Sequence, residues 1–343
     1  MLKLALACLA LASPALALAQ WTYVASGTTA ELRGLSIVDG QIVWASGARG
    51  AVLLSRDGGR TWRRDTVPGA TTLDLRAVHG RDEVTGFVAS AGEAEKGLAK
   101  IFATSTAGRS WRQVYSTEEK GVFLDAIAFW DRCNGIALSD PVDGAFFILT
   151  TADGGNTWTR IPAARLPRVL PGEAAFAASG SSLVVKGSSY VWIGTGGGGR
   201  ARVMRSADRG QSWTVTDVPV HADGAAAGIF SLAFFNERRG VAVGGDYTKP
   251  RLAARSVALT NDGGGSWHSA RAPAAAYLSS VSYAGSLARL VAVGLAGTFV
   301  SGDSGETWAQ TDTIAMNSVR FSGTTGIAVG PRGRIARTDA VAP

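Results

Sequence analysis

The sequence predicts an all-β protein, a seven-bladed β-propeller of four-stranded blades whose last blade is closed by an N-terminal strand. Three observations predict this fold. An eight-residue motif ending in tryptophan occurs six times, its tryptophans recur at intervals of 41 to 55 residues, and the C-terminus carries a half-repeat without its last strand. Intervals of about 40 to 50 residues are typical of propeller blades.

The motif first occurs as SRDGGRTW at residues 55–62, and the other copies end at Trp111, Trp158, Trp213, Trp267 and Trp308. Five copies keep an aspartate, at Asp57, Asp153, Asp208, Asp262 and Asp303, and the sixth has Thr106 instead. An aspartate before glycine favours a turn, because its carboxylate accepts backbone N–H groups and glycine adopts positive φ. We therefore expect these aspartates to be structural, and the tryptophans to pack between sheets.

The two ends of the chain together make one blade. Trp21 precedes Trp62 by 41 residues and begins a similar strand, although no motif precedes it. Residues 326–329 and 333–336 repeat the two strands that come before a motif, and no motif follows them. The N-terminal strand would supply the missing fourth strand, which removes open sheet edges from the ring.

Each repeat is expected to hold four short strands, which in the first copy are residues 32–38, 42–46, 51–55 and 61–67. The innermost strands are recognised by their apolar alternation. We expect them at residues 32–37, 75–80, 123–129, 172–178, 228–234, 277–283 and 315–321. These strands should line the central channel.

The first nineteen residues have the pattern of a signal peptide: Lys3, an apolar stretch, and small residues before a cleavage site between Ala19 and Gln20. Lipidation at Cys8 is the alternative, but so early a cut would leave almost no apolar region. No Pro-rich linker divides the remainder, so residues 20–343 are expected to form a single propeller domain. We expect a periplasmic or secreted protein.

Composition limits the partners and cofactors. Without Lys3 the chain has 33 basic and 27 acidic residues, dispersed along its length. It has no basic patch interleaved with aromatic residues, so nucleic acid is not expected as a partner. The histidines are far apart and Cys133 is the only cysteine after processing, so we expect no metal, no disulfide and no cofactor. We expect a monomer.

Candidate binding residues lie at one mouth of the channel. In an up-and-down blade, the loop entering the first strand and the loop between the second and third strands share one face, opposite the motif turns. Convergent charge at a concave mouth is the usual form of a binding site. The residues expected there are Arg33, Arg76, Asp125 and Glu173, with Asp140, Asp143, Asp246, Tyr247 and Lys249 in the overlying loops. The alternative is a solvated ion-pair network.

The motif pattern Ser/Thr-x-Asp-x-Gly-x-Ser/Thr-Trp resembles that of the BNR or Asp-box repeat propellers, over essentially the whole mature chain. Residues 135–141, GIALSDP, followed by a strand and TADGGNTW, are most similar to the photosystem II stability/assembly factor family and its exported bacterial relatives. Those relatives carry labels such as oxidoreductase or glycosyl hydrolase. The resemblance implies a scaffold whose channel-side face grips an unfolded or membrane-emerging protein segment.

Two hypotheses follow for the function. The first is a non-enzymatic scaffold that binds a protein or peptide and aids assembly or stability of a membrane-associated complex. The alternative is a glycoside hydrolase with a carbohydrate ligand and paired carboxylates drawn from Asp125, Glu173, Asp140 and Asp246. A sialidase is disfavoured because residues 31–34 read ELRG where an Arg-Ile-Pro motif is required. A redox enzyme would rest on family labels alone.

Overall fold

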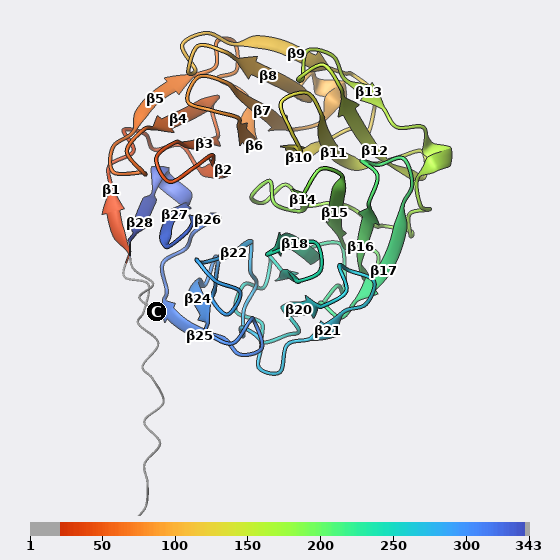
Figure 1. Cartoon of the computed structure of the whole chain (residues 1–343). Helices are drawn as coiled ribbons and strands as arrows, with labels where there is room; N and C mark the ends of the chain where they lie inside the picture. Colours follow the sequence, from red (N-terminus) through yellow and green to blue (C-terminus); the bar gives the residue numbers. More distant parts are fainter. Residues whose placement is uncertain (1–20, 340–343) are drawn as a thin grey trace, which may run out of the picture.

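The computed structural model describes residues 21–339, which form seven four-stranded antiparallel sheets arranged in a ring (Figure 1). The prediction of an all-β, seven-bladed propeller is confirmed. The expected signal peptide and its cleavage site at Ala19 and Gln20 lie outside the described residues. Within residues 21–339, no helix is long and apolar enough to cross a membrane.

The first six blades follow one another along the chain, each running from its innermost to its outermost strand. Blade 1 holds β2 (Leu32–Ile37), β3 (Val43–Gly47), β4 (Ala51–Ser55) and β5 (Arg63–Thr66). Blade 2 holds β6 (Asp74–Gly80), β7 (Gly86–Ala91), β8 (Lys100–Thr104) and β9 (Arg112–Ser116). Blade 3 holds β10 (Leu124–Phe129), β11 (Gly135–Val142), β12 (Ala145–Thr151) and β13 (Thr159–Arg160).

Blade 4 holds β14 (Leu183–Lys186), β15 (Tyr190–Thr195), β16 (Ala201–Ser206) and β17 (Thr214–Val218). Blade 5 holds β18 (Ala227–Phe234), β19 (Gly240–Asp246), β20 (Val257–Thr260) and β21 (His268–Ser269), and blade 6 holds β22 (Ser280–Tyr283), β23 (Leu290–Gly294), β24 (Gly297–Ser301) and β25 (Ala309–Asp312). Short 3₁₀ helices in the described residues are η1 (Ala94–Lys96), η2 (Ala163–Arg165) and η3 (Pro331–Gly333).

Blade 7 is assembled from both ends of the described chain. It holds β26 (Ser318–Ser322), β27 (Thr325–Val329) and β28 (Ile335–Thr338), and its outermost strand is β1 (Thr22–Val24). Thr22 pairs with Arg337 and Val24 with Ile335 in antiparallel register. The predicted closure by an N-terminal strand is therefore confirmed, and Figure 1 shows the first and last strands side by side.

Each copy of the eight-residue motif forms the turn between the third and fourth strands of its blade. In blade 1, Asp57 accepts hydrogen bonds from Ser55 Oγ (2.8 Å), Thr61 N–H (2.9 Å) and Thr61 Oγ1 (2.6 Å). The motif turn also docks onto the first hairpin of the same blade, because Gly58 N–H donates to Gln41 O at 2.9 Å. The two turns therefore share one face of the ring, which we call the motif face; the other is the loop face.

The motif tryptophans pack between neighbouring blades. Trp62 lies against a cluster that combines Leu35 and Leu53 of blade 1 with Ile327 of blade 7. Trp21 takes the equivalent place between blades 6 and 7. The tryptophans thus have the packing role expected from the sequence, because each sheet can bury its faces only against the next sheet in the ring.

One innermost strand was predicted wrongly. Residues 172–178 do not form the innermost strand of blade 4; that strand is β14, Leu183–Lys186. Residues 172–178 are mostly apolar, as the channel strands are, but they lie in the long connection from β13 to β14. Apolar composition alone cannot distinguish a strand that pairs within its blade from a segment that enters the channel, because both meet an apolar surface.

The motif carboxylates make the free energy of unfolding depend on pH in the acid range. The pKa of Asp262 is lowered from 3.8 to about 2 by hydrogen bonds from the Ser266 N–H and hydroxyl. A pKa that is lower in the folded state stabilises that state at pH values above the unfolded pKa, and this stabilisation is lost as the pH falls from about 4 to about 2.

We therefore expect the difference in free energy of unfolding between the wild type and Asp262→Asn to be larger at pH 6 than at pH 2.5, as measured by urea denaturation. Asp143→Asn is the matched control, because Asp143 is an exposed turn residue with φ of 52° that asparagine also adopts. An equal difference at both pH values for Asp262→Asn would contradict the stabilising role of the carboxylate.

Candidate functional site

The connection between β13 and β14 crosses the centre of the ring (Figure 1). We call residues 174–181 the channel segment. Its start is fixed on blade 3, where Ala175 N–H donates to Asp140 Oδ1 at 2.9 Å. Its end reaches blades 5 and 6, because Ser181 Oγ donates to Ser231 Oγ at 2.8 Å and Ser179 Oγ donates to Ser279 O at 2.9 Å.

Two glycines allow the channel segment to enter the channel. Ala174 and Gly196 exchange backbone hydrogen bonds of 2.8 and 3.0 Å, and Gly196 also bridges Gly228. A Cβ on Gly196 would lie 2.4 Å from Gly228 Cα, closer than any side chain permits. The absence of side chains at these two positions lets three backbones lie together at the loop face.

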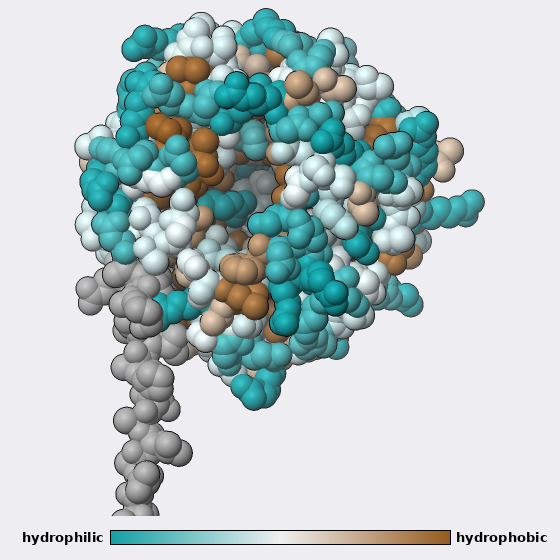
Figure 2. Space-filling model, viewed as in Figure 1, coloured by the Kyte–Doolittle hydropathy of each residue, from teal (hydrophilic) through white to brown (hydrophobic). Residues whose placement is uncertain are grey.

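The channel segment lies between two cavities. Residues 175–178 line a cavity of about 390 Å³ that opens on the loop face. Ser179 and Gly180 line a second cavity, of about 680 Å³, formed by the ends of the innermost strands on the motif face. Figure 2 shows the hollow at the centre of the ring on the face that it presents.

The loop-face cavity has a charged side formed by blades 1 to 3. Arg33 and Arg76 both line it, as predicted from the sequence. Each arginine is paired with an acid two residues before it, Arg33 with Glu31 at 2.6 Å and Arg76 with Asp74 at 2.7 Å. Arg33 also donates to Ala178 O of the channel segment at 3.4 Å. The guanidinium groups are thereby held in place at the rim while remaining partly exposed.

Two carboxyl groups, Asp125 and Asp140, line the same cavity. Asp125 is 1% exposed, and its Oδ2 has no hydrogen-bond partner among the described residues. Burial and the negative charge of Asp140 raise the pKa of Asp125, against the opposing effect of Arg76. Burial also raises the pKa of Asp140 to about 6, against the hydrogen bond from Ala175. When protonated, the unpartnered carboxyl group of Asp125 can donate a hydrogen bond to a ligand, and when ionised it can accept one.

The opposite side of the cavity is aromatic. Phe176 of the channel segment stacks on Phe230 of β18, with ring centroids 4.0 Å apart. Tyr277 and Tyr247 contact the edges of Phe230, at centroid distances of 4.8 and 6.1 Å. Tyr247 was predicted from the sequence and is 48% exposed, whereas Phe176, Phe230 and Tyr277 were missed. They come from three separate segments, and no sequence motif joins them.

Glu173 does not line the loop-face cavity. Its side chain is fully buried and forms a two-point ion pair with Arg202 of β16, one hydrogen bond of which measures 2.9 Å. Glu173 also accepts hydrogen bonds from Thr195 Oγ1 (2.6 Å) and Leu170 N–H (2.8 Å). With both oxygens occupied, this carboxylate anchors the start of the channel segment and is not free to bind a ligand.

The remaining predicted site residues serve the loops around the cavity. Asp246 accepts hydrogen bonds from the N–H and hydroxyl of Thr248, and Lys249 pairs with it at 3.4 Å. Asp143 occupies the exposed turn between β11 and β12. These three residues are absent from the cavity lining. Within residues 21–339 no cluster of three histidine, cysteine or acidic side chains could hold a metal ion.

No family model and no curated protein matches the sequence. Solved structures do match the fold. The chain is similar to a structure described as YCF48 bound to D1 peptide, with 18% identity, a TM-score of 0.65 and coverage of 93% of this chain and 97% of that one. It is also similar to YCF48 from Cyanidioschyzon merolae, with 15% identity, a TM-score of 0.66 and coverage of 93% and 98%.

A third similar structure is the GH74 enzyme of Niastella koreensis, with 15% identity and a TM-score of 0.63. The match covers 94% of this chain and 54% of that enzyme. At these identities the likeness establishes the seven-bladed propeller fold, whereas function depends on the residues of the site.

The buried ion pair between Glu173 and Arg202 allows a test of whether Glu173 anchors the start of the channel segment. Replacing Arg202 by methionine would leave the Glu173 carboxylate buried without its charge partner, which costs about 3 kcal/mol or more. We expect the free energy of unfolding of Arg202→Met, measured by urea denaturation, to fall by that amount.

Arg200→Met is the matched control. Arg200 lies two residues away and pairs with Asp217 at 3.1 Å, with both side chains largely exposed. Its removal should change stability by less than about 1 kcal/mol. Equal stability of the two variants would show that the Glu173–Arg202 pair does not anchor the connection.

Proposed function

We propose that this chain is an exported, non-enzymatic scaffold that binds an extended protein or peptide segment in the loop-face cavity and aids the assembly or stability of a membrane-associated complex. The observation that carries the proposal is the two-sided lining of that cavity. Arg33, Arg76 and Asp125 form the charged side of the cavity. The other side is formed by an aromatic cluster of Phe176, Phe230, Tyr247 and Tyr277.

A peptide matches both sides of this cavity. Its backbone carbonyl groups and any carboxylate accept hydrogen bonds from arginine, and its N–H groups can donate to the unpartnered Oδ2 of Asp125. An apolar side chain of the peptide would pack on the rings of Tyr247 and Phe230, since aromatic residues supply contact area at little cost in entropy. The volume of about 390 Å³ suits a few residues of extended chain and not a folded domain.

The surroundings of the cavity support the same proposal. Tyr247, Leu252 and Leu295 are among the most exposed large apolar side chains, at 48%, 40% and 38%, and all three belong to loop-face connections in blades 5 and 6. A solved propeller of the same fold is described as bound to a peptide. Export is proposed from the signal-peptide pattern before Gln20.

The proposal predicts that affinity depends on the two arginines. We expect a peptide array to yield ligands of the mature chain that combine aromatic and acidic residues, with affinity measured by calorimetry. Arg33→Ala/Arg76→Ala should weaken binding by at least about tenfold, because each lost charge-assisted hydrogen bond is worth about 1.5 kcal/mol or more. Arg64→Ala/Arg109→Ala removes two exposed arginines away from the cavity and is the matched control. Peptide binding at background level by both the wild type and the Arg33→Ala/Arg76→Ala variant would refute the proposal.

A glycoside hydrolase is the second candidate, and one observation favours it. Of the four carboxyl groups considered from the sequence, Asp125 and Asp140 line one cavity, whereas Glu173 and Asp246 are committed to structural contacts. A general acid with its pKa raised to about 6, as at Asp140, is a recurring feature of such enzymes.

This candidate predicts hydrolysis of a glucan panel, measured as release of reducing sugar. Activity should fall as the pH rises through about 6, since the general acid must be protonated. Asp140→Asn and Asp125→Asn should each lower kcat at least about a hundredfold. No reducing-sugar release by the wild type between pH 4 and 8 would rule out this candidate and leave the scaffold proposal standing.

A further inference from the structure

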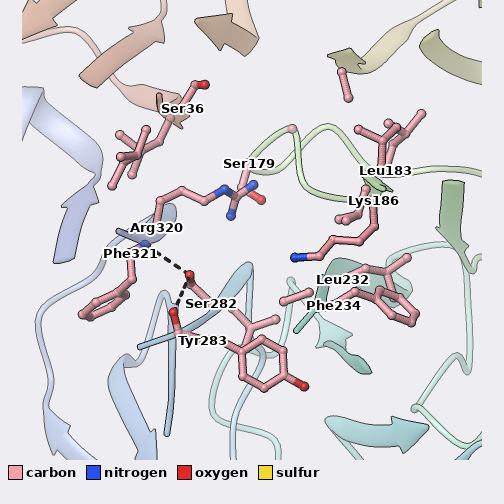
Figure 3. Close-up of a pocket in the computed structure, with 18 of the residues that line it drawn as sticks. Ser36, Ser179, Leu183, Lys186, Leu232, Phe234, Ser282, Tyr283, Arg320 and Phe321 are labelled. Atoms are coloured by element: carbon pink, nitrogen blue, oxygen red, sulfur yellow. Dashed lines mark hydrogen bonds between the residues drawn. The ribbon is translucent and has the colours of Figure 1, made fainter. Parts of the chain in front are cut away.

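The motif-face cavity differs in chemistry from the loop-face cavity. It is lined by the ends of the innermost strands of all seven blades together with Ser179 and Gly180 of the channel segment, and its volume is about 680 Å³ (Figure 3). Among the described residues that line it there is no aspartate and no glutamate. Two cationic side chains do line it, Lys186 at the end of β14 and Arg320 in β26.

Neither cation is neutralised by an acid. Within residues 21–339, Lys186 has no ion pair and no side-chain hydrogen bond, and Arg320 donates only to Ser280 Oγ at 3.3 Å and to Val319 O at 3.0 Å. Figure 3 shows the ends of both side chains pointing toward the middle of the cavity, from blades on different sides of the ring. One acid, Glu237, has its carboxylate close to Gly187, the residue after Lys186, but it is not part of the cavity lining.

The charge at this mouth is therefore positive at neutral pH. Burial lowers the pKa of Arg320 to about 10, which still leaves the guanidinium protonated. Burial and the nearby Arg81 lower the pKa of His79 to about 4, so the one histidine of the lining is neutral. Two cations that point into one hollow whose lining holds no acid form a site that favours an anion, because a cleft lined by one sign of charge raises the local concentration of counter-ions.

Part of the wall around the two cations is apolar. Ile37, Val185 and Phe321 line the cavity and are half-buried, and Phe235 lines it and is exposed. The lining therefore offers two charged donors for an anionic group, and hydrocarbon surface for the remainder of the same molecule.

We propose that the motif-face cavity binds an organic anion, with its carboxylate or phosphate group between Lys186 and Arg320 and its hydrocarbon part against the apolar wall. This site is separate from the peptide site of the loop face, since the channel segment lies between them. The planar guanidinium can hold two oxygens of the anion at once, and the lysine ammonium contributes a second charge.

Calorimetry with three eight-carbon probes tests the proposal. Octanoate carries a carboxylate, octyl phosphate a phosphate, and octanamide the same chain without charge. We expect the wild type to bind at least one of the two anions, and the stronger of them identifies the head group. We expect octanamide to bind at least about tenfold more weakly, because it lacks the charge-assisted hydrogen bonds.

Variants separate the site from general binding to a basic protein. Lys186→Met and Arg320→Met should each weaken anion binding at least about tenfold. Lys120→Met and Arg64→Met remove exposed cations of the same kinds elsewhere and should leave it unchanged. Circular dichroism and the melting temperature would show that each variant is folded.

The outcomes are decisive. Equal affinity for octanoate, octyl phosphate and octanamide, or unchanged anion binding by folded Lys186→Met/Arg320→Met, would overturn the proposal. Binding of neither anion by the wild type at millimolar concentration would do the same. Arg33→Ala/Arg76→Ala should keep its affinity for the anion, so this site and the peptide site can fail independently.

Discussion

The hydrogen bonds between the motif aspartate and its own turn underlie the rest of the structure. In blade 1, Asp57 fixes the reversal between β4 and β5, the same turn docks through Gly58 onto the first hairpin, and Trp62 leaves the turn to pack on blade 7. One local interaction thus links strand order, blade cohesion and contact between blades. It occurs in five of the six motifs, and in the sixth Thr106 takes the place of the aspartate and bonds to Ser110. These turns help to hold seven sheets in register in residues 21–339, where Cys133 is a free cysteine.

The sequence predicted the architecture well because the motif is local and repeated. The spacing of the tryptophans predicts the number of blades. Trp21, which begins a strand without a preceding motif, predicts that the N-terminal strand completes the seventh blade. Prediction failed at residues 172–178, which are mostly apolar like a channel strand but lie in a connection whose Ala174 pairs with Gly196. The cause is that a segment inside the channel has apolar neighbours, as a strand of a blade does, so the two have similar sequences.

The site was predicted only in part, for a related reason. Arg33, Arg76 and Asp125 line the loop-face cavity as expected, because strand direction assigns the first residues of an innermost strand to one mouth, and Asp140 does so because the second strand ends at the same mouth. Glu173 was misplaced because its partner, Arg202, lies 29 residues away and no motif connects them. The aromatic cluster was missed for the same reason, since it forms only when the channel segment brings Phe176 against β18. Side chains that meet through an irregular segment cannot be paired from periodicity.

The shared seventh blade also determines when the molecule can become complete. During synthesis, β1 is made first among the described strands and β28 last. Thr22 therefore cannot pair with Arg337 until the six other blades have been made. Until then blades 1 and 6 each expose a face that the closed ring buries. Closure of the ring joins residues 315 positions apart in the chain. Contacts of such separation form slowly, which makes the open ring the state in which this chain is most exposed to association with others.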